Sequence, residues 1–311
     1  MKKHFILLLL ALAISQPAWP RDGIVRVVTV CQEGLKGDSL VSDTFKRLDQ
    51  AVSFKPDIAC LPEDFTRGEP EAVPGPTTER VAKWAREHSC YVICPIRVKT
   101  GERAYNSAVL IDRQGKVAGR YDKIHPTEDE LRQGTSPGET DPPVFETDFG
   151  LIGIQICFDI EWPEGWRALA KKGAEIVFWP SAFAAGKKLN TRAWENQYCI
   201  VSSTLKDTTK IVDISGEDVA VSGHFSRWGV CAPVNLEKAF LATWPYVQSF
   251  PAIQQKYGRK IRITTLHEEE ISIIESLSAD VKIADVMKEF NLKTYREHLK
   301  SAEDKQAPHR V

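Results

Sequence analysis

The chain has 311 residues, with 41 Lys and Arg against 42 Asp and Glu, and a formal net charge of −1. Charges of both signs are scattered along the chain, which excludes the basic stripe of a nucleic-acid-binding protein and the acidic composition of a disordered one. The length fits one large domain or two ordinary ones, and the 42% hydrophobic content is typical of a globular protein.

The first residues have the pattern of a secretory signal peptide. A basic start, Met1 to His4, precedes an unbroken apolar run from Phe5 to Ile14, and small residues follow near Ser15 and Ala18. The run is too short to span a bilayer comfortably. We therefore expect residues 1–18 to be removed and the remaining protein to be exported, with no membrane association afterwards.

Strand-like and helix-like segments alternate through the first two thirds of the chain. Short apolar or alternating runs predict strands, and apolar residues at a spacing of three to four predict helices. The predicted strands cover residues 24–30, 58–62, 90–97, 104–112, 116–121, 151–157, 175–180, 199–204 and 210–214, and the predicted helices cover residues 38–53, 77–88, 164–172 and 189–198. This alternation with buried strands indicates an α/β fold built in layers.

The C-terminal third has a different pattern. Residues 244–259 are rich in aromatic residues and Pro and predict a loop, and the acidic run at residues 267–270 resembles a helix start. Residues 283–290 have amphipathic helical spacing. We expect one large domain over residues 19–265, and a helical extension over residues 266–311 that packs on the domain or on a partner subunit.

The apolar strand over residues 151–157 ends at a cysteine. Acidic residues and Pro163 follow at once, as is typical of a helix N-terminus. Cys157 should therefore lie in a sharp turn between a buried strand and a helix, where ligand sites of α/β sheets gather. This pattern alone leaves two interpretations open: a reactive thiol, or a small buried apolar residue.

Two further strand ends carry a charged residue, Glu63 and Lys123. Five segments, in this order, share a pattern with known proteins. They are Leu61-Pro62-Glu63, Tyr121-Asp122-Lys123-Ile124-His125, Gly153-Ile154-Gln155-Ile156-Cys157-Phe158-Asp159 with Trp162-Pro163-Glu164, Trp179-Pro180-Ser181-Ala182-Phe183, and Arg192-Ala193-Trp194-Glu195-Asn196. With these motifs the chain resembles the nitrilase superfamily of carbon–nitrogen hydrolases over residues 24–242.

The resemblance implies an αββα sandwich that commonly stacks with a second copy, so we expect a homodimer or a higher homo-oligomer. It implies that Cys157 is the nucleophile, Glu63 the general base and Lys123 the stabiliser of the tetrahedral intermediate. A second active-site glutamate is best matched by Glu130, with Glu128 as the competitor. It implies no cofactor, and no cysteine and histidine stand at the spacing of metal ligands, so we expect no metal.

Four more residues are candidates for oxyanion stabilisation or substrate binding. The backbone N–H of Phe158 is a second donor for the oxyanion. Trp179, Ser181 and Phe183 lie at or just after a strand end, which slightly favours a substrate wall over core packing of the aromatic cluster, so we expect them to line the substrate.

The substrate class is narrowed by the residues after the nucleophile. Nitrile-cleaving members of the family usually have Trp-Glu there, whereas this chain has Phe158 and Asp159. The pattern is therefore closer to amidases and N-carbamoyl amidohydrolases, with a small amide or carbamoyl compound as substrate. A nitrilase, an acyltransferase and a non-catalytic binding protein on the same fold remain as alternatives.

Two other patterns carry no predicted chemistry. Residues 134–138 match the G-x-S-x-G motif of serine hydrolases, but no buried strand precedes it and prolines follow it, so we predict a loop. The other six cysteines lie mostly in strand-like runs, which does not indicate a disulfide framework.

Overall fold

The computed structural model describes residues 23–224 and 226–310. The predicted signal peptide, residues 1–18, lies outside the described residues. Among the helices of the described part, none is long and apolar enough to cross a bilayer.

The first of two large sheets is mixed, with a parallel centre. Strand β1 pairs parallel with β2 and antiparallel with β12, and β2 pairs parallel with β3. In spatial order the strands are β12 (Gly229–Asn235), β1 (Ile24–Val30), β2 (Ile58–Cys60), β3 (Tyr91–Thr100), β4 (Arg103–Ile111) and β5 (Val117–Asp122). The last three form an antiparallel meander, as the predicted hairpin near Gly115 requires.

The second large sheet has the same plan. Strand β8 pairs parallel with both β7 and β9, and antiparallel strands complete the edges. In spatial order the strands are β11 (Asp218–Val221), β10 (Lys210–Val212), β9 (Cys199–Thr204), β8 (Ile176–Ser181), β7 (Gly150–Ile154) and β6 (Val144–Thr147). Because β7 and β8 are buried on both faces, they read as continuous apolar runs in the sequence.

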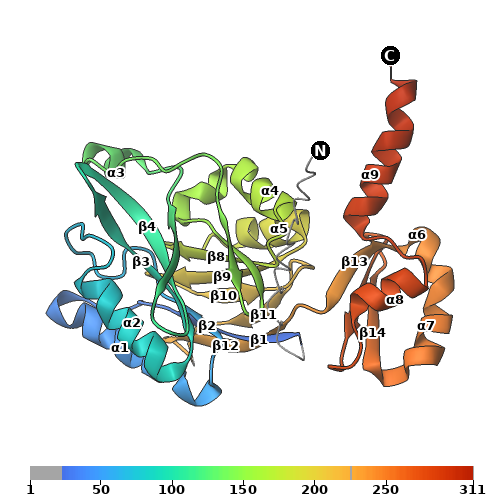
Figure 1. The fold of residues 1–311 in the computed structure, drawn as a ribbon, viewed down its shortest axis with the longest axis horizontal. Coiled ribbons are helices and arrows are strands. Elements are labelled where there is room, and N and C mark those ends of the chain that lie inside the picture. Colours follow the sequence, from blue (N-terminus) through green and yellow to red (C-terminus); the bar gives the residue numbers. More distant parts are fainter. Residues whose placement is uncertain (1–22, 225, 311) are drawn as a thin grey trace, which may run out of the picture.

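The two sheets face each other between layers of helices (Figure 1). Apolar residues of both sheets, such as Ile58 and Ile154, form one central cluster. A second cluster lies beneath helices α1 (Leu40–Asp49) and α2 (Pro76–His88), and a third beneath α4 (Pro163–Lys171) and α5 (Lys187–Asn196). The predicted αββα sandwich is therefore confirmed.

A polar contact also joins the two sheets, at the strand end that leads to Glu63. The buried hydroxyl of Ser203 on β9 shares its one proton between the carbonyl oxygens of Val30 (2.6 Å) and Cys60 (3.0 Å), at the ends of β1 and β2. Both carbonyls belong to the first sheet, whereas Ser203 belongs to the second. This bond fixes the end of β2, from which the chain continues to Glu63.

The C-terminal unit, residues 238–310, contains its own three-stranded sheet. In spatial order its strands are β13 (Lys238–Ala242), β15 (Ile271–Ser276) and β14 (Ile261–Leu266), and its helices are α6 (Thr243–Tyr246), α7 (Phe250–Tyr257), α8 (Ile283–Glu289) and α9 (Tyr295–Gln306). The unit lies beside the sandwich, with α9 projecting from it (Figure 1). Phe240 packs against Trp194 of α5, with ring centroids 5.1 Å apart, and so joins the unit to the sandwich.

The structure differs from the sequence prediction in this unit. The predicted boundary at residues 265/266 falls inside β14, one residue before its end, and β14 pairs with β15 from Leu266 and Ile271 onward. The acidic residues 267–270 form the turn of this hairpin and not a helix start, because alternating β-branched residues on both sides favour pairing. The predicted loop over residues 244–259 contains α6 and α7, since proline is tolerated in a first helical turn.

One side chain anchors the last helix to the sandwich. The guanidinium of Arg296, in the first turn of α9, donates to the carbonyl oxygens of Ala170 (2.9 Å) and Asn196. These carbonyls lie in the last turns of α4 and α5, where a helix has unpaired acceptors and partial negative charge. Arg296 therefore holds α9 against the two helices of the second sheet.

We predict that Arg296→Ala loosens this attachment. A hydrogen bond from a charged group contributes about 1.5–3 kcal/mol, so local opening of α9 should become easier by at least about this amount. Hydrogen exchange of the amides in α9 measures the change. Lys300→Ala, which removes an exposed ion pair within the same helix, is the control and should leave exchange unchanged. Equal exchange in Arg296→Ala and the native protein would contradict the anchoring role.

Candidate active site

Glu63, Lys123 and Cys157 lie together at one end of the sandwich. Glu63 follows β2, Lys123 follows β5 directly, and Cys157 follows β7. All three side chains line one cleft of about 430 Å³. The residues lining this cleft are Glu63, Asp64, Arg67, Asn106, Lys123, Thr127, Glu130, Cys157, Ala182 and Leu205.

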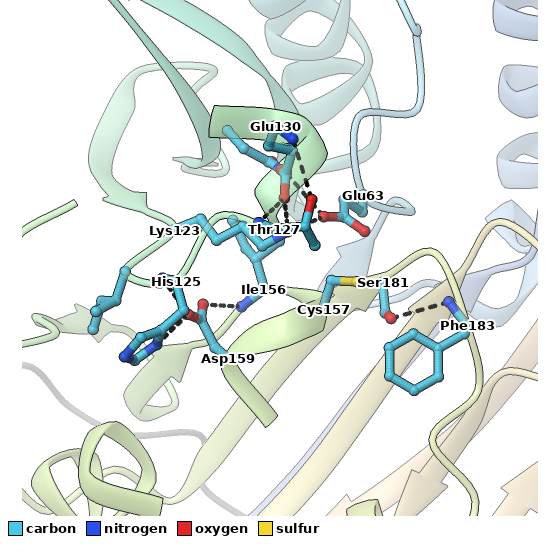
Figure 2. A network of polar contacts seen from close by, with 12 residues as sticks. Glu63, Lys123, His125, Thr127, Glu130, Ile156, Cys157, Asp159, Ser181 and Phe183 are labelled. Carbon is cyan, nitrogen blue, oxygen red and sulfur yellow. Dashed lines mark hydrogen bonds and ion pairs between the residues drawn. The ribbon is translucent and has the colours of Figure 1, made fainter. Parts of the chain in front are cut away.

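The ammonium of Lys123 is held between two carboxylates (Figure 2). Its Nζ lies 2.9 Å from Oε1 of Glu63 and 2.8 Å from Oε2 of Glu130, and the lysine side chain is only 1% exposed. Burial by itself lowers the pKa of Lys123, but the negative charges of Glu63 and Glu130 outweigh it and raise this pKa above its usual value. Lys123 is therefore a cation throughout the neutral pH range.

Asn106 joins the same two carboxylates. Its Nδ2 donates to Oε1 of Glu63 (2.8 Å) and to Oε1 of Glu130 (2.7 Å). Its backbone carbonyl also accepts from the N–H of Lys123 (2.8 Å). Asn106 was not selected from the sequence, although a buried amide inside the apolar strand β4 was a signal that could have found it.

Glu130, and not Glu128, reaches the lysine. Glu130 is the third residue of helix α3 (Glu128–Arg132), where its carboxylate accepts from the N–H of Thr127 (2.7 Å) in a capping box. Glu128 is 89% exposed and faces Arg132. Burial would raise the pKa of Glu130, but the charge of Lys123 and its hydrogen bonds bring this pKa below its usual value. Glu130 is thus ionised beside the lysine.

Cys157 lies at a strained turn between β7 and a short 3-10 helix, Cys157–Glu161. Its φ of 46° is in the left-handed region, which is unusual for a residue other than glycine and is typical of functional sites. Burial and the charge of Glu63 raise the pKa of the thiol to about 12, while Lys123 and hydrogen bonds from Ala182 and Ser181 oppose the rise. The resting nucleophile is therefore a neutral thiol that needs a proton acceptor.

Asp159 connects the cysteine turn to the lysine segment. This fully buried carboxylate accepts from the N–H of Ile156 (2.9 Å) on one side and from the hydroxyl of Tyr121 (2.7 Å) and the N–H of His125 (2.9 Å) on the other. The His125 ring also stacks on Trp162, with centroids 4.0 Å apart. From the sequence, Asp159 was part of a motif but had no predicted role in positioning the site.

The remaining candidates lie in different positions relative to the cleft; they are Trp179, Ser181, Phe183 and Phe158. Trp179 is fully buried behind the cysteine, where its indole N–H donates to the carbonyl oxygen of Cys157 (3.0 Å), so it supports the turn and does not line the cleft. Phe183 packs edge-on against Trp179 and donates its N–H to the hydroxyl of Ser181 (3.1 Å), which lies next to the sulfur of Cys157 (Figure 2).

Phe158 directly follows Cys157 in the 3-10 helix, and the role of its backbone N–H as an oxyanion donor stays a prediction. Phe158 is the second residue of the 3-10 helix, and the N–H groups of a first helical turn have no partner within the helix. Its ring packs edge-on against Trp162, with centroids 5.0 Å apart, outside the cleft lining. Any contribution of Phe158 to the site is thus through its backbone.

The G-x-S-x-G segment is a loop, as predicted. Ser136 donates its N–H to the carbonyl of Ala104 (2.7 Å), and Gly138 donates to the carbonyl of Lys123 (2.8 Å). The loop supports the backbone next to the lysine. Its serine is therefore not placed in a strand-to-helix turn and does not line the cleft.

Several known proteins are similar to this chain in sequence. A hydrolase encoded in the pqqF 5′ region of Pseudomonas protegens is 35% identical over 52% of this chain and 63% of its own. A beta-ureidopropionase of Arabidopsis thaliana is 36% identical over 36% of this chain and 29% of its own. A nitrilase of Pyrococcus abyssi is 32% identical over 54% of this chain and 70% of its own. The chain thus spans less than two thirds of the first two relatives.

Solved structures share the fold. An amidase from Nesterenkonia sp. superposes with a TM-score of 0.57 and 21% identity, over 71% of this chain and 93% of its own. A variant of that amidase carries the acetamide moiety of fluoroacetamide covalently at its active-site cysteine, and superposes with a TM-score of 0.58 and 20% identity over the same shares.

The family model for carbon–nitrogen hydrolases matches residues 28–240, which is more than half of the chain and ends where the C-terminal unit begins. This match covers all five motifs on which the resemblance rests, and the fold agrees with it. The chain therefore belongs to the carbon–nitrogen hydrolase family of the nitrilase superfamily.

Proposed function

We propose that this protein hydrolyses a non-peptide carbon–nitrogen bond, in a linear amide or an N-carbamoyl compound, through a thioester on Cys157. The observation that carries the proposal is one cleft lined by a thiol, a carboxylate and a buried lysine ammonium. An amide carbon is a weak electrophile, so a sulfur nucleophile with both a base and an oxyanion donor is the suitable catalyst.

Glu63 is the proton carrier of this mechanism. Its carboxylate takes the proton of the Cys157 thiol as sulfur attacks the carbonyl carbon, and passes that proton to the leaving nitrogen as the C–N bond breaks. Ammonia or an amine leaves, and the acyl group stays on sulfur. Glu63 then takes a proton from water, hydroxide attacks the thioester, and the proton returns to the departing sulfur of Cys157.

Lys123 stabilises the charge that develops on the substrate. The attack puts a negative charge on the carbonyl oxygen, and the Nζ of Lys123 and the N–H of Phe158 are the donors proposed to receive it. The carboxylates of Glu63 and Glu130 hold the ammonium in place before substrate arrives. The site therefore needs little reorganisation during the reaction.

Amides and carbamoyl compounds are proposed ahead of nitriles. Phe158 and Asp159 follow the nucleophile, where nitrile-cleaving members usually have Trp-Glu, and Asp159 is fully engaged in holding Ile156 and Tyr121. Similar proteins include a beta-ureidopropionase and an amidase, but also a nitrilase. Turnover of matched amide, carbamoyl and nitrile substrates, followed by release of ammonia, separates these activities.

Export and assembly are further parts of the proposal. The pattern of residues 1–18 supports export through a signal peptide. The stacking that is common in the family supports a homodimer or a higher homo-oligomer. N-terminal sequencing of secreted protein tests the first, and light scattering of the purified protein tests the second.

We predict that Cys157→Ala abolishes turnover and leaves the fold intact, because alanine keeps the Cβ in the same left-handed backbone. Ammonia release from a panel of amides and carbamoyl compounds measures activity, and intact mass after a short incubation detects the acyl adduct. The control is Cys231→Ala, which removes a cysteine of β12 outside the cleft and should keep activity. Turnover by Cys157→Ala would rule out the thioester mechanism.

We predict that Lys123→Ala lowers kcat about 100- to 1,000-fold, as expected for loss of one oxyanion donor. The same change leaves two carboxylates without their cation, so the midpoint of thermal unfolding should fall as well. The control is Lys116→Ala at the exposed β4–β5 turn, where neither quantity should change. A folded Lys123→Ala variant with a near-native kcat would assign the oxyanion to other donors.

We predict that alkylation of Cys157 keeps accelerating above the pKa of an ordinary thiol. The thiolate is the reactive form, and the raised pKa of about 12 means that its fraction still increases with pH above 9.0, the pKa of an unperturbed cysteine. Iodoacetamide labelling at about pH 8 to pH 10, read by peptide mass, gives the profile. Glu63→Gln removes a negative charge that raises this pKa, so labelling at about pH 8 should become faster while turnover is lost. A plateau near pH 9 in the native protein would contradict the raised pKa.

A further inference from the structure

The turn that follows Glu63 presents two charged side chains to the cleft that the proposed chemistry does not use. Asp64 and Arg67 both line the cleft, together with the three proposed catalytic residues. They stand three residues apart on one turn, in which the N–H of Arg67 donates to the carbonyl of Asp64 (2.9 Å). One is a carboxyl group and the other a guanidinium.

This turn is held firmly in a strained shape. Phe65 is fully buried, its N–H donates to the carbonyl of Pro95 (3.3 Å), and its carbonyl accepts from Nε2 of the buried Gln32 (2.8 Å). On either side of Phe65, Asp64 and Arg67 adopt φ values of 39° and 49°, in the left-handed region. Strain of this kind persists only where the surrounding structure enforces it, and it is concentrated at functional sites.

One carboxyl oxygen of Asp64 lacks a partner. Its Oδ1 is buried without any hydrogen bond in the described structure, whereas buried polar atoms are nearly always bonded. Burial raises the pKa of Asp64 to about 7, against the opposing charge of Arg97. Asp64 lines the cleft, so its carboxyl group is the acceptor that a cationic group of a ligand would meet there.

The guanidinium of Arg67 is likewise available to bind a group of a ligand. Its side chain is exposed, and within the described residues it forms no ion pair or hydrogen bond with another side chain, Asp64 included. A guanidinium is well suited to bind a carboxylate through two parallel hydrogen bonds. The turn therefore offers one acceptor group and one anion-binding group to the same cleft.

We propose that Asp64 and Arg67 form a subsite for an amino-acid group on the acyl part of the substrate. The ammonium of that group binds Asp64, its carboxylate binds Arg67, and the scissile amide extends to Cys157. The inference rests on the proposed amide hydrolysis and specifies its substrate class as an amino acid with an amide at the end of its side chain. A ligand with both charges on one carbon matches the two oppositely charged side chains of one turn.

Four substrates of one length test the subsite. L-Glutamine has both charged groups, glutaramic acid lacks the ammonium, γ-aminobutyramide lacks the carboxylate, and butyramide lacks both. The same set built on asparagine shortens the spacer by one methylene. For the native enzyme we expect kcat/KM to be highest for the compound with both groups, by about 10- to 100-fold for each group present.

The variants Asp64→Asn and Arg67→Gln are measured with the same substrates. Asp64→Asn should lower the preference for compounds with an ammonium about 10- to 100-fold, and Arg67→Gln should do so for compounds with a carboxylate. The matched controls, Glu128→Gln and Arg132→Gln on the exposed face of α3, should keep the native preferences. Each variant changes one preference, whereas a purely structural defect lowers all four rates together.

The outcomes separate this inference from the proposed function. If butyramide is hydrolysed as well as the charged compounds, or if both variants lower all four rates equally, the subsite is refuted and the hydrolase stands. If the native protein releases no ammonia from the amide and carbamoyl panel and forms no acyl adduct, the proposed hydrolysis itself is refuted.

Discussion

The active site depends on a single buried cation. The ammonium of Lys123 is almost fully removed from water and is compensated by two carboxylates, Glu63 and Glu130. An unpaired charge at such a depth would be strongly unfavourable, so each member of this group requires the others. Asn106 donates to both carboxylates as well: it shares Oε1 of Glu63 with the lysine, and on Glu130 it binds the oxygen that the lysine does not. The same compensation that stabilises the fold therefore places a cation and a base within reach of the substrate.

The second requirement is that Cys157, which follows a strand of the second sheet, lies close to Lys123 and its two carboxylates. The shared apolar core aligns the sheets only along their faces, whereas Asp159 and Ser203 form directed bonds at the catalytic end. Asp159 holds both the turn before Cys157 and the segment before Lys123, and Ser203 holds the end of the strand before Glu63. Buried side chains outside the reaction thus set the distances inside it.

The layered fold and the three strand ends that carry the proposed catalytic residues could be predicted from the sequence. Strand-end positions follow from the period of apolar residues, so Glu63, Lys123 and Cys157 could be selected without coordinates. Asn106 and Asp159 could not be assigned a part, because their importance lies in bonds between segments far apart in the chain. Trp179 was predicted to face the substrate but lies in the core, since a strand residue at a sheet end can point to either face. The C-terminal hairpin was missed because an acidic turn and an acidic helix start have similar composition.

The raised pKa of Cys157 also bears on the proposed export. Outside the cytoplasm a reactive thiolate is prone to oxidation, and susceptibility follows thiolate character. With a pKa of about 12, nearly all of the resting site is neutral thiol. In the proposed mechanism the proton leaves when substrate is bound and Glu63 accepts it, so the nucleophile is generated when it is needed. The cysteines of the described chain are all free, and those other than Cys157 do not line the cleft, which limits pairing with the nucleophile. A cysteine hydrolase is thereby compatible with an oxidising compartment without a separate reducing partner.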